Sequence, residues 1–125
     1  DFAGQRGFLA LDVVNDTHEW AYPGLLPEDG HPAFSPNQRW LVSDTLRFPP
    51  DYISRLILID VNSGHGRTVG AFSSESHITG DVRCDLHPRW HPDGNYLTFD
   101  SVHEGHRQIY MLDAESAWRL GSSQS

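Results

Sequence analysis

One segment occurs twice in this chain, and this internal repeat constrains the fold more than any other feature. Residues 31–45 (HPAFSPNQRWLVSDT) align without a gap with residues 87–101 (HPRWHPDGNYLTFDS). Both copies read His-Pro-x-aromatic-x-Pro, then Asn or Asp, two residues, an aromatic residue, Leu, two residues, Asp, and Thr or Ser. In each copy a turn leads into alternating large apolar and smaller or polar residues, which is typical of a half-buried β-strand. The chain is therefore expected to contain two copies of one β-structural unit.

The segments around the two copies also favour short strands. Residues 55–61 (RLILIDV) have the strongest strand pattern, and the hairpin signal Asn62-Ser63-Gly64 follows them before a return strand over 67–72. Further strands are expected over 7–14, 39–45, 89–90, 95–100 and 108–113, with a last strand starting at 118–120. No segment of useful length shows a 3.6-residue apolar period, so helix is expected to be scarce.

Four short strands in each unit, with units of roughly 40 to 55 residues, are typical of β-propeller blades. The expected fold class is all-β: antiparallel four-stranded blades, about two and a half of them, in a single partial propeller over 1–125. We assign 7–22 to the outer edge of a preceding blade, 31–72 to a complete blade and 87–120 to a second blade. Because a propeller closes with about 4 to 8 blades, we expect a fragment of a larger propeller of about seven blades, or a piece that assembles with other copies. A compact two-sheet sandwich is the alternative.

The composition limits the classes of binding partner and the cellular compartment that fit this chain. The 125 residues include seventeen acidic and nine basic ones, for a net charge of -8, which argues against a broad nucleic-acid surface. No apolar run approaches the ~20 residues that a membrane helix needs. The single cysteine, Cys84, excludes an internal disulfide framework. A cytoplasmic location is expected, and a periplasmic one is the alternative, because a signal peptide removed before Asp1 would leave no trace.

Two histidines, His31 and His87, occupy equivalent positions of the repeat, just before the strand expected to be innermost in each blade. Innermost strands line the channel of a propeller, so two imidazoles from adjacent blades are expected to converge near its axis. Neutral imidazole suits Zn, Mn, Fe or Ni, and an added carboxylate moves the preference toward harder ions. Asp85, two residues before His87, would point to the same side of an extended segment. The alternative is that each histidine hydrogen-bonds a neighbouring blade.

Arg83 and Arg89 flank these candidate ligands, and each could bind a substrate carboxylate through two hydrogen bonds. A salt bridge to Asp81 or Asp85 is the alternative for both. The sequence contains no Gly-x-Ser-x-Gly elbow, phosphate loop or HExxH motif. A serine hydrolase, a nucleotide enzyme or a zincin therefore has no support in these residues.

Other polar residues are expected to have structural roles. Asp44-Thr45 and Asp100-Ser101 recur in both copies, which favours a shared role in tying the strand end to the next turn. His91 is expected to cap the turn that follows it, and His103-Glu104 to form a solvated turn.

The run Pro-x-Trp-x-Pro-Asp-Gly, continued by Phe-Asp-Ser and Arg-Gln-Ile-Tyr, resembles the repeat of TolB-like propellers. More specifically, residues 29–32 (DGHP), 83–90 (RCDLHPRW) and 99–110 (FDSVHEGHRQIY) resemble the C-terminal half of oligogalacturonate lyases, over about residues 7–113. The resemblance implies a bacterial enzyme of pectin degradation that cleaves by β-elimination. A divalent ion, usually manganese, would bind the C6 carboxylate and acidify the C5 proton, which a base removes.

By this resemblance, His31 and His87 match metal-ligand positions of the family. Another family histidine corresponds to Asp85, which can still ligate, whereas the family's glutamine falls on Val82, which cannot. The implied manganese site is therefore His31, His87 and Asp85, with Arg83 as a candidate carboxylate binder. The family's catalytic base belongs to an earlier blade, so no residue here inherits that role and the isolated segment is expected to be inactive.

Two further functions fit the same sequence. The first is a non-catalytic TolB-like propeller that binds protein or glycan through its channel face, with structural histidines. The second is the propeller part of a peptidase that lacks its hydrolase domain. Under the lyase interpretation the partners are an oligosaccharide with uronate carboxylates and the remaining blades or other copies of the chain, with neither nucleic acid nor membrane.

Overall fold

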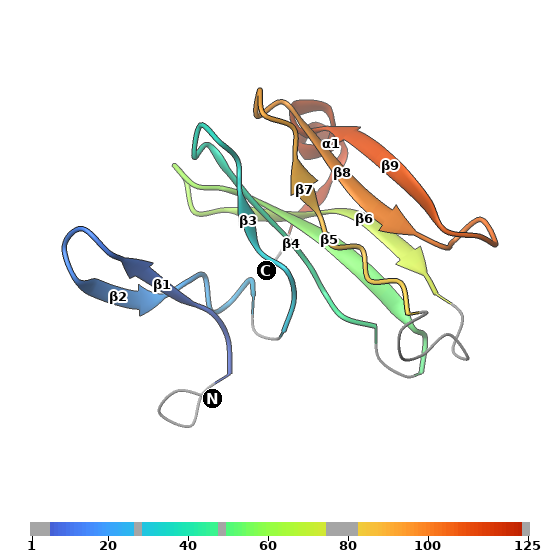
Figure 1. Cartoon of the computed structure of the whole chain (residues 1–125), viewed down its shortest axis with the longest axis horizontal. Coiled ribbons are helices and arrows are strands. Elements are labelled where there is room, and N and C mark those ends of the chain that lie inside the picture. The colour runs from blue at the N-terminus through green and yellow to red at the C-terminus, as the bar shows by residue number, and fades with distance from the viewer. Residues whose placement is uncertain (1–5, 27–28, 48–49, 75–82, 124–125) are drawn as a thin grey trace.

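The computed structural model describes residues 6–26, 29–47, 50–74 and 83–123, and it contains three antiparallel β-sheets and one short helix within these ranges (Figure 1). The strands are β1 (Leu9–Asp12), β2 (Thr17–Trp20), β3 (Ala33–Phe34), β4 (Trp40–Asp44), β5 (Ile53–Asp60), β6 (Gly66–Ser73), β7 (Arg89–Trp90), β8 (Tyr96–Ser101), β9 (Gln108–Asp113) and β10 (Ser122–Ser123); the helix is α1 (Ala114–Leu120). The predicted all-β fold is confirmed. No helix among the described residues has the length and apolar character to cross a bilayer.

The sheets follow one another in chain order (Figure 1). Strands β1 and β2 form a hairpin at one end, in which Leu9 pairs with Trp20 and the Asp12 carboxylate accepts the Val14 N–H at 3.0 Å. The central sheet has the strand order β10-β6-β5-β4-β3, and the last sheet has the order β7-β8-β9. We call β3–β6 the first blade and β7–β9 the second blade, because their strands pair in succession as the repeat predicts.

The first blade is buried on both faces, which explains its nearly continuous apolar strands. Its forward face, which packs against the second blade, carries Trp40, Val42, Leu56 and Leu58, each at most 2% exposed. Its rear face carries Leu41, Ile57 and Ile59 and packs against Leu26 and residues near the hairpin. Burying each such side chain contributes roughly 1.5–3 kcal/mol to folding. The stack of sheets is therefore held together by two separate apolar layers.

The second blade packs on the first through the alternate residues of its own strands. Leu97 is fully buried and Phe99 is 2% exposed, and both contact the forward face of the first blade. Tyr110 and Leu112 lie at the margin of the same cluster. These four residues form the rear face of the second blade.

The C-terminal part differs from the prediction. Residues 118–120 belong to α1 rather than to a strand, so the second blade has three strands among the described residues. The Asp113 carboxylate accepts the Ser116 N–H at 2.9 Å and caps the helix, and Glu115 and Arg119 complement its dipole at the two ends. Strand β10 then pairs with β6 of the first blade instead of with β9. The chain after β9 therefore forms a capped helix in place of the expected fourth strand.

Candidate functional site at the junction of the two blades

The first strands of the two blades lie next to each other. The indole Nε1–H of Trp90 in β7 donates to the carbonyl oxygen of Ala33 in β3 at 2.8 Å. His31 and His87 precede these strands by two residues each. The entry segments of adjacent blades are thereby brought together, although they are far apart in the sequence.

The two imidazoles do converge, as the repeat predicts. The rings of His31 and His87 stack with their centroids 4.3 Å apart and their planes at 24°. The His31 side chain is 33% exposed, and His87 is an exposed residue with a φ of 43°. The His87 ring is therefore accessible to solvent, and the His31 ring is partly accessible.

The carboxylate of Asp44, at the end of β4, holds this histidine pair in place. Its Oδ1 accepts the backbone N–H of His31 at 2.7 Å, and its Oδ2 accepts the backbone N–H of His87 at 2.9 Å. The Nδ1 atom of His31 lies 3.1 Å from both oxygens. Because the Asp44 side chain is fully buried, one carboxylate joins the entry segments of two blades. Asp44 therefore has a structural role, as the repeat predicts, but it ties the strand end to the entry segments of its own blade and of the next blade, not to the turn that follows it.

A glycine makes this close approach possible. A Cβ atom on Gly30 would lie 2.1 Å from the carbonyl oxygen of Asp44 and 3.0 Å from the hydroxyl of Ser43. Position 30 therefore accepts no side chain while the entry segment stays against β4.

Asp85 and the two candidate substrate-binding arginines lie beside the histidine pair in ion pairs. The Arg83 guanidinium is 2.8 Å from Asp85 Oδ2, and the Arg89 guanidinium is 2.8 Å from Asp100 Oδ1. The salt bridge considered as the alternative for Arg83 is present, whereas Arg89 pairs with Asp100 and not with Asp85. Asp81 and Val82 lie outside the described residues.

A polar pocket of about 230 Å³ opens next to His87. It is lined by Arg83, Cys84, Asp85, His87, Arg89, Asp100 and Arg107. The Oδ1 atom of Asp85 is buried there and has no hydrogen-bond partner among the described residues. Burial raises the pKa of the Cys84 thiol, and Cys84 is a buried free cysteine, as the sequence suggests.

The metal site implied by the family resemblance fits these residues only in part. His31 and His87 are adjacent, and the Asp44 carboxylate at His31 Nδ1 leaves Nε2 as the outward nitrogen, an arrangement that also orients metal-bound histidines. Asp85, however, directs one oxygen to Arg83. In the part of the chain that the structure describes, no three His, Cys, Asp or Glu side chains are grouped so that they could hold an ion.

One polar network links the predicted turn at His103 and Glu104 to Ser101 and Tyr110, two partners that the sequence does not predict. At the turn between β8 and β9, Tyr110 donates its hydroxyl to Glu104 at 2.5 Å, and His103 contacts Ser101 at 2.7 Å. The hydrogen bond to Glu104 raises the pKa of Tyr110 to about 12. A tyrosine of this kind stays protonated at neutral pH and is not a general base. The contact between Tyr110 and Glu104 arises because the β8–β9 hairpin loop brings residues six positions apart together. No sequence motif predicts this contact.

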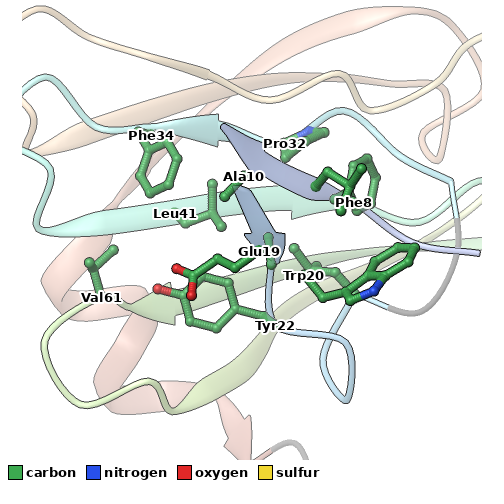
Figure 2. A pocket seen from close by; sticks show the side chains of 12 residues that line it. Phe8, Ala10, Glu19, Trp20, Tyr22, Pro32, Phe34, Leu41 and Val61 are labelled. Carbon is green, nitrogen blue, oxygen red and sulfur yellow. The ribbon is translucent and has the colours of Figure 1, made fainter. Parts of the chain in front are cut away.

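A larger, apolar hollow of about 500 Å³ lies between the hairpin and the rear face of the first blade. Figure 2 shows Phe34, Leu41 and Val61 of the first blade around it, with Tyr22 of the hairpin region extending toward Val61 and Trp20 at the other end. The carboxylate of Glu19 is the charged group of this lining. The hollow marks where the hairpin covers the rear face incompletely.

Comparison with solved structures decides the architecture. The structure is similar to the crystal structure of TolB from Acinetobacter baumannii, with a TM-score of 0.59 and 16% sequence identity over 94% of this chain. These residues have the β-propeller fold. They span 26% of the TolB chain, so they correspond to a few blades of such a propeller. No protein-family model and no curated protein matches the sequence. The propeller prediction is thus confirmed, and the more specific resemblance to oligogalacturonate lyases stays a prediction.

Proposed function

We propose that this chain is part of a TolB-like propeller that binds a protein or glycan through the channel end of its blades, without catalysing a reaction. The observation that carries the proposal is the stacked pair of His31 and His87 at the blade junction. The Asp44 carboxylate holds this pair by accepting the backbone N–H groups of both histidines. One exposed ring stacked on a partly exposed one, both held by a buried carboxylate, forms a preorganised surface for stacking and hydrogen bonding.

The charged groups around the pair support binding over catalysis. The Asp44 carboxylate accepts backbone N–H groups of two blades, so it serves the fold. Arg83 and Arg89 are paired with Asp85 and Asp100 but are still 49% and 45% exposed. Their remaining N–H groups can donate to carbonyl, hydroxyl or carboxylate oxygens of a ligand. The surface thus offers recognition groups.

A binding experiment tests this proposal. The labelled chain is applied to a glycan array and to a pull-down from a lysate, as wild type and as His87→Ala; His65→Ala, which removes an exposed loop histidine, is the control. We expect a defined glycan or a stable protein partner that His87→Ala loses and His65→Ala retains. Retention by His87→Ala would place the binding surface elsewhere.

A second candidate function is the metal-dependent lysis of oligogalacturonate, in which this chain would supply part of the manganese site. The observation that favours it is the contact between His31 Nδ1 and Asp44, because a carboxylate at one ring nitrogen fixes the other as a ligand. Calorimetric titration with Mn²⁺ tests this candidate. Affinity that falls tenfold or more in His87→Ala and is unchanged in His65→Ala would support it; equal affinity in all three chains would contradict it.

A further inference from the structure

The stacked arrangement of His31 and His87 does not suit a shared metal ion. The ring centroids are 4.3 Å apart and the ring planes are at 24°, so the planes are close to parallel. A histidine nitrogen binds a metal along a lone pair that lies in the plane of its ring, at roughly 2 Å for zinc. The lone pairs of two nearly parallel rings, one above the other, do not meet at one ion. The junction therefore has to recognise a ligand with its own side chains.

The cationic groups of the polar pocket beside His87 are guanidinium groups. The Arg83 guanidinium lies 2.8 Å from Asp85 Oδ2, so an arginine engages this carboxylate. The Arg89 guanidinium lies 2.8 Å from Asp100 Oδ1. A guanidinium group stays charged and has five N–H donors, so each pair still presents donors to the pocket.

Arg107 lines the same pocket, although no sequence pattern identifies it as a binding residue. One of its terminal nitrogens donates to the carbonyl oxygen of Arg83 at 2.8 Å, and the residue is exposed. This bond orients the guanidinium group and uses one of its five N–H donors. Arg107 therefore adds a third source of donors at the pocket.

The mixture of charges in the pocket favours a neutral ligand. A carboxylate would face the Asp85 and Asp100 carboxylates, and an ammonium group would face three guanidinium groups. The Oδ1 atom of Asp85 is buried at the pocket and has no hydrogen-bond partner among the described residues. A buried acceptor without a partner costs free energy. The group that fits must therefore donate to a carboxylate oxygen and accept from guanidinium N–H groups.

A hydroxyl group meets both requirements at a single atom, because it has one O–H donor and two lone pairs. A backbone amide carries its donor and its acceptor on different atoms that point in opposite directions. The His87 ring lines the same pocket and is exposed, which adds an aromatic surface beside the hydroxyl-binding groups. A sugar ring combines an apolar C–H face with a rim of hydroxyl groups and therefore matches both parts.

The size of the pocket also fits a sugar unit. Its volume is about 230 Å³, whereas pockets that enclose a drug-sized ligand have roughly 300–1,000 Å³. This pocket therefore has room for a single sugar ring and not for a folded protein segment. The remaining units of a longer glycan would lie outside it.

We propose that the polar pocket and the His87 ring form a metal-independent subsite for one neutral sugar unit of a glycan. The guanidinium groups of Arg83 and Arg107 donate to hydroxyl oxygens, and Asp85 accepts from a hydroxyl group. The His87 ring stacks on the C–H face of the sugar. This subsite rests on the proposed function, in which the histidine pair binds a protein or a glycan, and it selects the glycan.

A glycan array with and without a divalent ion tests the subsite. The intact polypeptide that carries residues 1–125 is applied to an array of neutral oligosaccharides and of oligogalacturonates, once with EDTA and once with Mn²⁺. The neutral oligosaccharide that binds best is then titrated calorimetrically into the wild type and the variants. We expect a neutral oligosaccharide to bind with the same affinity in both buffers.

Asp85→Ala and Arg107→Ala should each weaken this binding about tenfold or more, since each removes a hydrogen bond that involves a charged group. Arg107→Ala changes an exposed side chain and reports on the pocket even if Asp85→Ala fails to fold. Asp51→Ala is the matched control, because it breaks an exposed ion pair with Arg55 at 4.0 Å, outside the pocket. It should bind as the wild type does.

The possible failures of the subsite and of the proposed function can be told apart. Binding that requires Mn²⁺, binding to oligogalacturonates alone, or unchanged affinity in Arg107→Ala would overturn the subsite. A protein partner that depends on His87, with no glycan bound, would also overturn it and would leave the proposed function intact. A ligand that His87→Ala retains, or the absence of any ligand, would overturn both.

Discussion

Asp44 and Asp100 occupy the same position of the repeat, but their carboxylates have different partners. Asp44 is fully buried and accepts two backbone N–H groups, whereas Asp100 is 24% exposed and pairs with Arg89. Asp44→Asn replaces one accepting oxygen by an NH₂ group that opposes a backbone N–H. We expect it to lower the free energy of unfolding by about 1–3 kcal/mol, the cost of a buried unsatisfied donor.

Urea denaturation of Asp44→Asn measures this effect, and Asp100→Asn is the matched control. Loss of an exposed ion pair should cost roughly 0.2–1 kcal/mol. Equal losses in the two variants would show that Asp44 does not tie the two blades.

The hydrogen-bonded Tyr110 should make the stability of the folded chain depend on pH. The hydrogen bond to Glu104 raises its pKa from 10.0 to about 12. The folded chain therefore keeps this proton where the unfolded chain loses it, so the contribution to stability is complete below pH 10 and is lost as the pH rises from 10 through 12. Ultraviolet titration should show one tyrosine that ionises near 12, and Glu104→Gln should bring it back toward 10; a titration unchanged by that variant would refute the pairing.

Single residues also show where sequence reasoning succeeds. The convergence of His31 and His87 follows from their repeat positions, because equivalent residues of adjacent blades lie side by side. The Asp44 bridge depends on the positive φ of His87 and on the close approach at Gly30. Neither of these backbone features can be read from composition or spacing.

At the level of elements, the entry to β3 depends on Gly30. In Gly30→Ala the new methyl group would overlap the Asp44 carbonyl, and the segment with His31 must move away from β4. We expect a loss of about 1–3 kcal/mol in the free energy of unfolding, as for other overpacked sites. Gly24→Ala, where nothing lies within 4 Å, is the control in thermal and urea melts; a Gly30 variant as stable as this control would disprove the constraint.

The elements also show why part of the fold escapes sequence analysis. Asp60 and Asp113 are equivalent, but Asp60 is followed by a turn and β6, and Asp113 by α1. A helix of seven residues is too short to show a 3.6-residue period. The strands, by contrast, are recognisable from their apolar runs, and β9 begins and ends where the pattern predicts. The capping interactions at Asp113 therefore favour a helix at the position where the equivalent Asp60 is followed by a turn and a strand.

At the scale of the whole molecule, the stack of sheets predicts a gradient of local stability. Strands β4 and β5 are covered on both faces, whereas β1 and β2 form a two-stranded hairpin with mostly exposed residues. Such a hairpin is only marginally stable by itself. Native-state hydrogen exchange should show the slowest amides in β4 and β5 and the fastest in β1 and β2. Uniform exchange would contradict a stack in which the first blade is the central layer.

Absorbance measurements on the intact polypeptide that carries residues 1–125 test most directly whether the histidine pair recognises a ligand without catalysis. The polypeptide is incubated with oligogalacturonate and Mn²⁺, and the absorbance of unsaturated products is followed for wild type and His87→Ala. We expect no increase in absorbance with either protein. We also expect His87→Ala to lose binding to the ligand that the glycan array or pull-down identifies for the wild type. An increase that requires Mn²⁺ and disappears in His87→Ala would contradict a binding function and establish a lyase.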